Sequence, residues 1–157
     1  MYEQGLCILE SDEDSHPYNF PNKKIILCGV PGAFTPGCTN EHLPGFASNL
    51  DKLKEKGIEK VIFISINDAW VMNAWNKHHG HPDIDCIGDP HGLFADWINK
   101  TVDYGPGKHK WCSRFAVLIE NGEIVKEFSR ARSILFVLII RIKLLGNIFG
   151  RGTVDVK

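Results

Sequence analysis

Three residues have the types and spacing of a reactive-thiol site. Cys38 follows Thr35 by three positions and Pro31 by seven, in the segment PGAFTPGC. A cysteine thiolate is a strong nucleophile, and a hydroxyl three residues upstream can share a pocket with the sulfur where the cysteine opens a helix. The chemistry that this spacing predicts is nucleophilic attack by the thiolate of Cys38.

The flanking segments predict a strand, a loop and a helix that place Cys38 at a helix start. Residues 24–30 form an apolar run of strand length, and the glycines and prolines of residues 31–37 are typical of a loop. Apolar residues then recur every three or four positions over 39–56, which predicts a helix that ends at Gly57. Unpaired N–H groups and the positive end of the helix dipole favour a thiolate there.

The rest of the chain predicts an α/β fold in which helices flank a mixed central sheet. Apolar runs indicate strands, and Asn121-Gly122 is a strong hairpin signal. Residues 11–22 are predicted as loop, so the N-terminal part of the sheet is expected to be missing. The other expected elements are strands over 60–66 and 84–87, helices over 68–78 and 91–97, a loop over 101–110, and hairpin strands over 114–119 and 122–128.

The segment around Cys38 also resembles a known active site. The frame PxxxTxxC, followed by HLPGF, is similar to the signature of peroxiredoxins of the type II, or peroxiredoxin-five-like, branch. The similarity continues through SINDAWVMNAW, IGDPHGLFA and SRFAVLIENGEI, and it covers about residues 24–127. The resemblance implies a thioredoxin-like fold in a single domain over residues 1–157, with an atypical C-terminal tail over 128–157.

The resemblance implies an antioxidant enzyme, a thiol-dependent peroxidase. Its Cys38 thiolate would reduce hydrogen peroxide and organic hydroperoxides and become a sulfenic acid. Thr35 and Arg114 would hold the peroxide and the sulfur, and Pro31 would shield the thiol. His42 would support the arginine. Thr35 as a local turn contact and His42 as a surface residue remain the alternatives.

The reductant of the sulfenic acid is a second question. Relatives in this branch often carry a resolving cysteine near the C-terminus, whereas this chain has none after Cys112. Strand alternation would aim Cys112 and Arg114 at the same face, which makes Cys112 the best internal candidate, against burial as a small apolar side chain. An external thiol, from glutathione, glutaredoxin or thioredoxin, is therefore the expected reductant.

Composition limits the other classes of function. The net charge of -1 gives no general attraction to nucleic acid or membranes. Five cysteines without a CxxC pair favour a reducing compartment, and the acidic stretch at residues 10–14 argues against a signal or transit peptide, so a cytoplasmic location is expected. The cluster of His78, His79, His81, Asp83, Asp85 and Cys86 matches no zinc spacing. We expect a solvated loop there, and neither a metal nor a cofactor.

Both ends depart from the family pattern. Residues 134–140 are seven apolar residues in a row, too few to span a bilayer. They could close the core, bind a membrane or partner, or belong to an altered tail. The alternative function is therefore an impaired protein of the same fold that acts as a redox-signalling or binding module. Family likeness also suggests a homodimer.

Overall fold

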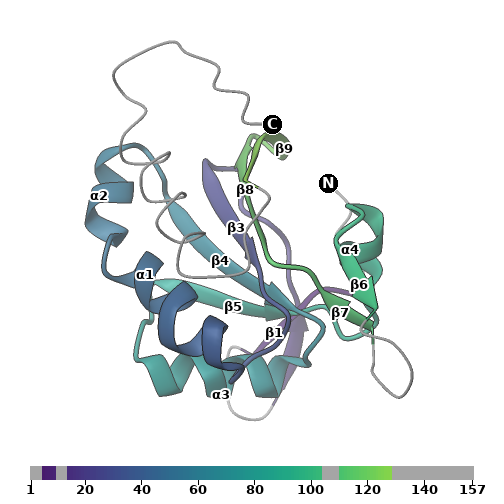
Figure 1. The fold of residues 1–157 in the computed structure, drawn as a ribbon. Helices are drawn as coiled ribbons and strands as arrows, with labels where there is room; N and C mark the ends of the chain where they lie inside the picture. Colours follow the sequence, from purple (N-terminus) through teal and green to yellow (C-terminus); the bar gives the residue numbers. More distant parts are fainter. Residues whose placement is uncertain (1–4, 10–13, 104–109, 129–157) are drawn as a thin grey trace, which may run out of the picture.

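The computed structural model describes residues 5–9, 14–103 and 110–128. In this part of the chain one seven-stranded sheet has the order β2-β1-β5-β4-β3-β8-β9, and a two-stranded sheet joins β6 to β7 (Figure 1). The strands are β1 Cys7–Leu9, β2 Ser15–Pro17, β3 Ile25–Gly29, β4 Lys60–Ser65, β5 Ile84–Gly88, β6 Thr101–Asp103, β7 Lys110–Cys112, β8 Phe115–Glu120 and β9 Glu123–Phe128.

The centre of the large sheet is parallel, and its two sides are antiparallel. Strands β3, β4 and β5 run parallel, and β8 lies antiparallel to β3. All five residues of β3 are buried, which explains why its sequence is continuously apolar rather than alternating. Asn121 and Gly122 both have positive φ, as a tight hairpin turn requires. The predicted strands and hairpin are confirmed.

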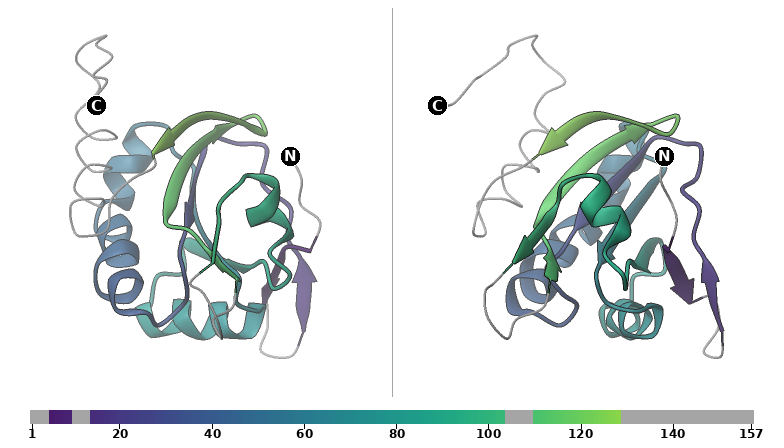
Figure 2. Two further views of the ribbon diagram at one scale, coloured as in Figure 1. Left: turned by 45° about the vertical axis from the view of Figure 1, so that its right-hand side comes forward. Right: turned by 90° about the vertical axis from the view of Figure 1, so that its right-hand side faces the viewer.

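Helices cover both faces of the sheet. The π-helical turn η1 (Cys38–His42), α1 (Leu43–Ala47), α2 (Leu50–Glu55) and α3 (Ala69–His79) lie on one side, and α4 (Leu93–Trp97) lies on the other (Figures 1 and 2). Each face buries its own apolar cluster. Asp68 accepts a hydrogen bond from the Val71 N–H and caps α3, as the sequence predicts. The predicted mixed sheet flanked by helices is confirmed.

The prediction of one helix over residues 39–56 is wrong. The segment divides into η1, α1 and α2, with a turn at Ser48 and Asn49. Pro44 has no N–H for an i to i−4 bond, and the N–H of Leu43 bonds to the Cys38 carbonyl five residues back. The side-chain amide of Asn49 donates to the Gly45 carbonyl at 2.7 Å. It therefore occupies an acceptor that a backbone N–H would use if the helix continued.

Two segments predicted as loop contain strands. The N-terminal region adds β1 and β2, and β1 pairs with β5 through Cys7 and Gly88. The region 101–110 contributes β6 and the first residue of β7. Each of these strands is only three residues long, which is too short for an alternating apolar pattern to indicate it. The interpretations of residues 134–140 and of most of the 128–157 tail lie outside the described residues.

No helix within residues 5–9, 14–103 and 110–128 combines the length and apolar character needed to cross a bilayer.

Candidate active site

Cys38 lies in the first turn of a helical segment that begins at Pro36. The strand β3 ends at Gly29, residues 31–35 form the connecting loop, and the N–H of Thr39 donates to the Thr35 carbonyl at 2.9 Å. Proline suits the first helical position because that position needs no N–H donor. The side chain of Cys38 is fully buried among apolar residues. The predicted placement at a helix start is confirmed, although the first turns are π-helical.

Arg114 contacts the sulfur of Cys38 directly. Its Nη2 donates to Sγ at 3.3 Å, across 76 positions of sequence. Strand register creates this contact, because Gly29 pairs with Phe115 and so brings the start of β8 beside the end of β3. A Cβ on Gly37 would lie 3.2 Å from the same Nη2, so a glycine there lets the guanidinium rest against the helix start. The arrangement places a cation on a buried nucleophilic atom.

The hydroxyl of Thr35 makes a hydrogen bond within its own loop. Its Oγ1 donates to the Gly32 carbonyl at 2.8 Å, which is the local turn contact given above as the alternative to a catalytic role. The oxygen keeps lone pairs that can accept a further hydrogen bond. Thr35 and Pro31 line a hollow of about 480 Å³ beside the loop. Their predicted catalytic roles stay predictions.

His42 is buried, so the alternative of a surface histidine is wrong. Its ring is fully buried and lies 5.1 Å from the ring of Phe63 and 5.7 Å from that of Phe46, between centroids. Burial, and secondly the positive charge of Arg114, lower the pKa of His42 from 6.5 to about 3. A neutral imidazole therefore lies near the arginine at neutral pH. The supporting role itself remains a prediction.

The buried His42 makes stability depend on pH. Its pKa is depressed in the folded chain, so the unfolded chain binds more protons between about pH 3 and pH 6.5. The contribution of the neutral His42 to the free energy of unfolding is therefore fully present above pH 6.5 and is lost as the pH falls toward 3. As the pH is lowered through this window, we expect the free energy of unfolding of the wild type to fall relative to that of His42→Gln by up to about 1.4 kcal/mol per pH unit. Urea unfolding of both proteins at several pH values measures this difference. If the free energies of unfolding of the two proteins changed in parallel with pH, the expectation would be contradicted.

Cys112 does not share a strand with Arg114. The strand β7 ends at Cys112, and Arg114 precedes β8, so the alternation argument is wrong. Cys112 packs in the apolar cluster with Ile25 and Leu27, whereas Cys38 belongs to the cluster on the other face. Burial, and secondly the charge of Asp89, raise the pKa of the Cys112 thiol. These features weigh against Cys112 as a resolving thiol, a role that stays a prediction.

The remaining cysteines are also unpaired thiols. Cys28 and Cys86 are buried, and burial raises the pKa of both. Cys7 is half-buried, and its thiol donates to the Gly88 carbonyl at 3.6 Å. Within the described residues, Cys38 alone among the five cysteines accepts a hydrogen bond from a cationic side chain. The structure therefore places Arg114 against the cysteine that the sequence predicts as the nucleophile.

The prediction of a solvated loop over the histidine-rich cluster is wrong, because His78 and His79 end α3 and the buried Cys86 lies in β5. The rings of His79 and His81 stack at 6.5 Å between centroids, and His79 also contacts Trp75 edge to face. Within the described residues, no group of three or more histidine, cysteine, aspartate or glutamate side chains is arranged to hold a metal ion.

Sequence reasoning missed Asn67. Its Oδ1 accepts hydrogen bonds from the Ala33 N–H and from the Ser65 hydroxyl, both at 2.9 Å. The residue also lines the hollow beside Thr35. The segment SINDAW carries the family resemblance, but nothing local in it indicates that its asparagine reaches the loop before Cys38.

Known proteins are similar to this chain in sequence and in fold. The Redoxin family model matches residues 11–133. The hybrid peroxiredoxin hyPrx5 of Haemophilus influenzae is 37% identical over 112 residues, which are 69% of this chain and 46% of that protein. The crystal structure of reduced Prx3 from Vibrio vulnificus has a TM-score of 0.76 at 31% identity and covers 84% of each chain. That of a Plasmodium falciparum antioxidant protein, a 1-Cys peroxiredoxin, has a TM-score of 0.77 at 29% identity and covers 87% of this chain and 88% of that one.

These matches identify the class. The chain belongs to the redoxin family, with the thioredoxin-like fold, and within it to the type II, peroxiredoxin-five-like peroxiredoxins. The chain spans 46% to 62% of the length of the curated relatives that it matches.

Proposed function

We propose that this protein is a thiol-dependent peroxidase that reduces hydrogen peroxide and small organic hydroperoxides. The observation that carries the proposal is the 3.3 Å contact from Arg114 Nη2 to Cys38 Sγ at a helix start. A peroxidatic sulfur must be an anion, and a guanidinium donor stabilises an anionic sulfur and can also hold a peroxide oxygen. Membership of the peroxiredoxins supports the same function, and it does not favour the impaired signalling module.

The chemistry is a two-electron transfer from sulfur to a peroxide. The Cys38 thiolate attacks one oxygen of the O–O bond, an S–O bond forms, and the O–O bond breaks. Sulfur is oxidised to the sulfenic acid, while the departing oxygen takes the electron pair and a proton and leaves as water or an alcohol. Negative charge grows on that oxygen, so donors aimed at it accelerate the step. Arg114 and N–H groups at the helix start are the available donors, while the Thr35 hydroxyl, which donates to the Gly32 carbonyl, can accept a hydrogen bond from the peroxide.

Pro31 has a different role in this proposal. It stands at the start of the 31–35 loop and lines the hollow of about 480 Å³ together with Thr35. Its fixed φ limits the conformations of the loop, and its ring shields the buried sulfur from larger oxidants.

The neutral imidazole of His42 adds no competing positive charge near Arg114, which leaves the guanidinium free of like-charge repulsion from that side.

An external thiol completes the cycle in this proposal. The sulfenic acid reacts with a thiol to form a mixed disulfide and water, and a second thiol releases Cys38. Cys112 packs on the opposite face and is buried, so glutathione, glutaredoxin or thioredoxin is the proposed reductant. The similar Plasmodium protein is described as a 1-Cys peroxiredoxin, which supports this reading.

The proposal extends to organisation and location. A single domain over residues 1–157 is supported by one sheet that joins segments from Cys7 to Phe128. A homodimer is supported by apolar surface near the site, because the side chain of Phe34 is 51% exposed. A cytoplasmic location is supported by five unpaired cysteines, which a reducing compartment would preserve.

Peroxide consumption in steady state tests this function. The reduced protein is mixed with hydrogen peroxide and supplied in turn with glutathione and glutaredoxin, with thioredoxin and its reductase, or with dithiothreitol. We expect catalytic consumption with at least one of these thiol systems. Cys112→Ser is expected to retain it, because the proposed reductant is external. Consumption no faster than that of each thiol system without the protein would overturn the proposal.

A further inference from the structure

The side chain of Asn67 holds the loop that precedes the nucleophile. Its Oδ1 accepts the N–H of Ala33 at 2.9 Å, in the middle of the segment from Pro31 to Thr35. The same oxygen accepts the hydroxyl of Ser65 at 2.9 Å. Ser65 is the last residue of β4 and is buried, so the second contact ties the amide to the rigid centre of the sheet.

The backbone of Asn67 is itself fixed. A Cβ added to Gly88 would lie 2.6 Å from the carbonyl oxygen of Asn67 and 3.0 Å from the carbonyl carbon of Asp68. This close approach shows that the chain after β4 packs directly on the end of β5. The Asp68 carboxylate caps α3 through the Val71 N–H at 2.8 Å, which anchors the next residue as well. Little freedom remains for the amide to move away from the loop.

The loop, in turn, sets the groups that face a peroxide. The hydroxyl of Thr35 donates to the Gly32 carbonyl at 2.8 Å, and the amide of Asn67 bonds to the residue after Gly32. A Cβ on Gly32 would lie 3.4 Å from Thr35 Cγ2 and 3.8 Å from Asn67 Oδ1, so the three residues are in close contact. A shift of Ala33 therefore moves both the Thr35 hydroxyl and the first turn that carries Cys38.

We propose that Asn67 is a positioning residue, which sets the Pro31–Thr35 loop for peroxide through its hydrogen bond to Ala33. The inference rests on the proposed function and assigns a role to a residue on the connection between β4 and α3. Asn67 is not a donor to the sulfur in this account. It acts through the loop, so it should affect the reaction with a peroxide more than the general reactivity of the thiol.

A ratio of two rates tests this role. The second-order rate of Cys38 oxidation by hydrogen peroxide is divided by the rate of Cys38 alkylation by iodoacetamide, which needs the thiolate but no peroxide-binding loop. Asn67→Ala and Asn67→Leu remove the acceptor, and we expect the ratio to fall by about tenfold or more, because small misplacements of reacting groups are costly. Asn67→Asp keeps an acceptor oxygen. Its added charge acts on both reactions, so its ratio should stay within about threefold of wild type.

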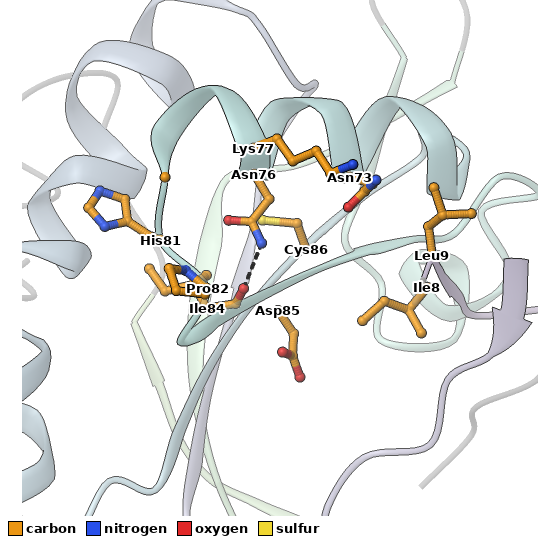
Figure 3. A pocket seen from close by; sticks show the side chains of 11 residues that line it. Ile8, Leu9, Asn73, Asn76, Lys77, His81, Pro82, Ile84, Asp85 and Cys86 are labelled. Atoms are coloured by element: carbon orange, nitrogen blue, oxygen red, sulfur yellow. Dashed lines mark hydrogen bonds between the residues drawn. The ribbon is translucent and has the colours of Figure 1, made fainter. Parts of the chain in front are cut away.

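Asn76→Leu is the matched control. Asn76 also makes a hydrogen bond from its amide, to the Ile84 carbonyl at 2.9 Å, in a hollow between α3, β1 and β5 (Figure 3). This hydrogen bond joins α3 to the start of β5 and involves no residue of the loop before Cys38, so its loss should leave the ratio unchanged even where the fold is loosened.

Three results would overturn the role of Asn67: an unchanged ratio in both Asn67→Ala and Asn67→Leu, an equal fall in Asn67→Asp, or an equal fall in Asn76→Leu. Failure of the proposed function looks different. In that case the wild type itself reacts with peroxide no faster than a free thiol does at the same pH.

Discussion

Replacing Arg114 with methionine is expected to slow the oxidation of Cys38 by hydrogen peroxide about 100-fold or more. The guanidinium donates to Sγ at 3.3 Å, so the substitution removes both a positive charge and a hydrogen-bond donor from the sulfur. Removing a single donor from a preorganised anion site costs about 10²- to 10³-fold in rate. Methionine fills a similar volume, so the loss is mainly of charge and hydrogen bonds.

The measurement is the rate of Cys38 oxidation in a rapid-quench experiment at fixed pH. Arg114→Lys should recover only part of the rate, because an ammonium cannot present a planar fork to sulfur and peroxide together. Lys54→Met is the matched control, since Lys54 pairs with Asp83 at 3.3 Å on the exposed side of α2. A rate within about threefold of wild type in Arg114→Met would show that the arginine does not serve the reaction.

Local sequence predicts the position of Cys38 at a helix start. Cys38 lies in the first turn of a helical segment, as the loop-to-helix pattern predicts, although that segment begins at Pro36 inside the predicted loop, and Asn121-Gly122 forms the predicted turn. These features depend on backbone conformations within a few residues, which glycine and proline largely determine. The helix after Cys38 was predicted too long because apolar spacing continues through Pro44 and Asn49, while a missing N–H and a competing amide interrupt the hydrogen bonds.

Contacts between distant segments are harder to predict. The Arg114 contact depends on the pairing of β3 with β8, and only the family resemblance indicated it. His42 follows Cys38 by four positions, and the sequence left a surface histidine open as the alternative, yet the ring of His42 packs against those of Phe46 and Phe63. Asn67 reaches Ala33 across 34 positions. Each of these depends on tertiary packing, which periodicity in one segment does not report.

The second large effect concerns Cys38 itself. One sulfur, buried at a helix start beside Arg114, is proposed to perform the chemistry, while burial raises the pKa of the Cys28, Cys86 and Cys112 thiols. A thiol whose pKa is raised has little thiolate at neutral pH and reacts slowly with peroxide. Oxidation by a small amount of peroxide should therefore be confined to one residue, and Cys38→Ser should abolish it.

The most direct measurement is rapid mixing of the fully reduced protein with one equivalent of hydrogen peroxide, followed by trapping with dimedone and peptide mass analysis. We expect a dimedone adduct on Cys38 that is absent in Cys38→Ser and retained in Cys7→Ser, which replaces the half-buried thiol of β1. Adducts spread over several cysteines, or an equal loss of peroxide in Cys38→Ser, would contradict this expectation.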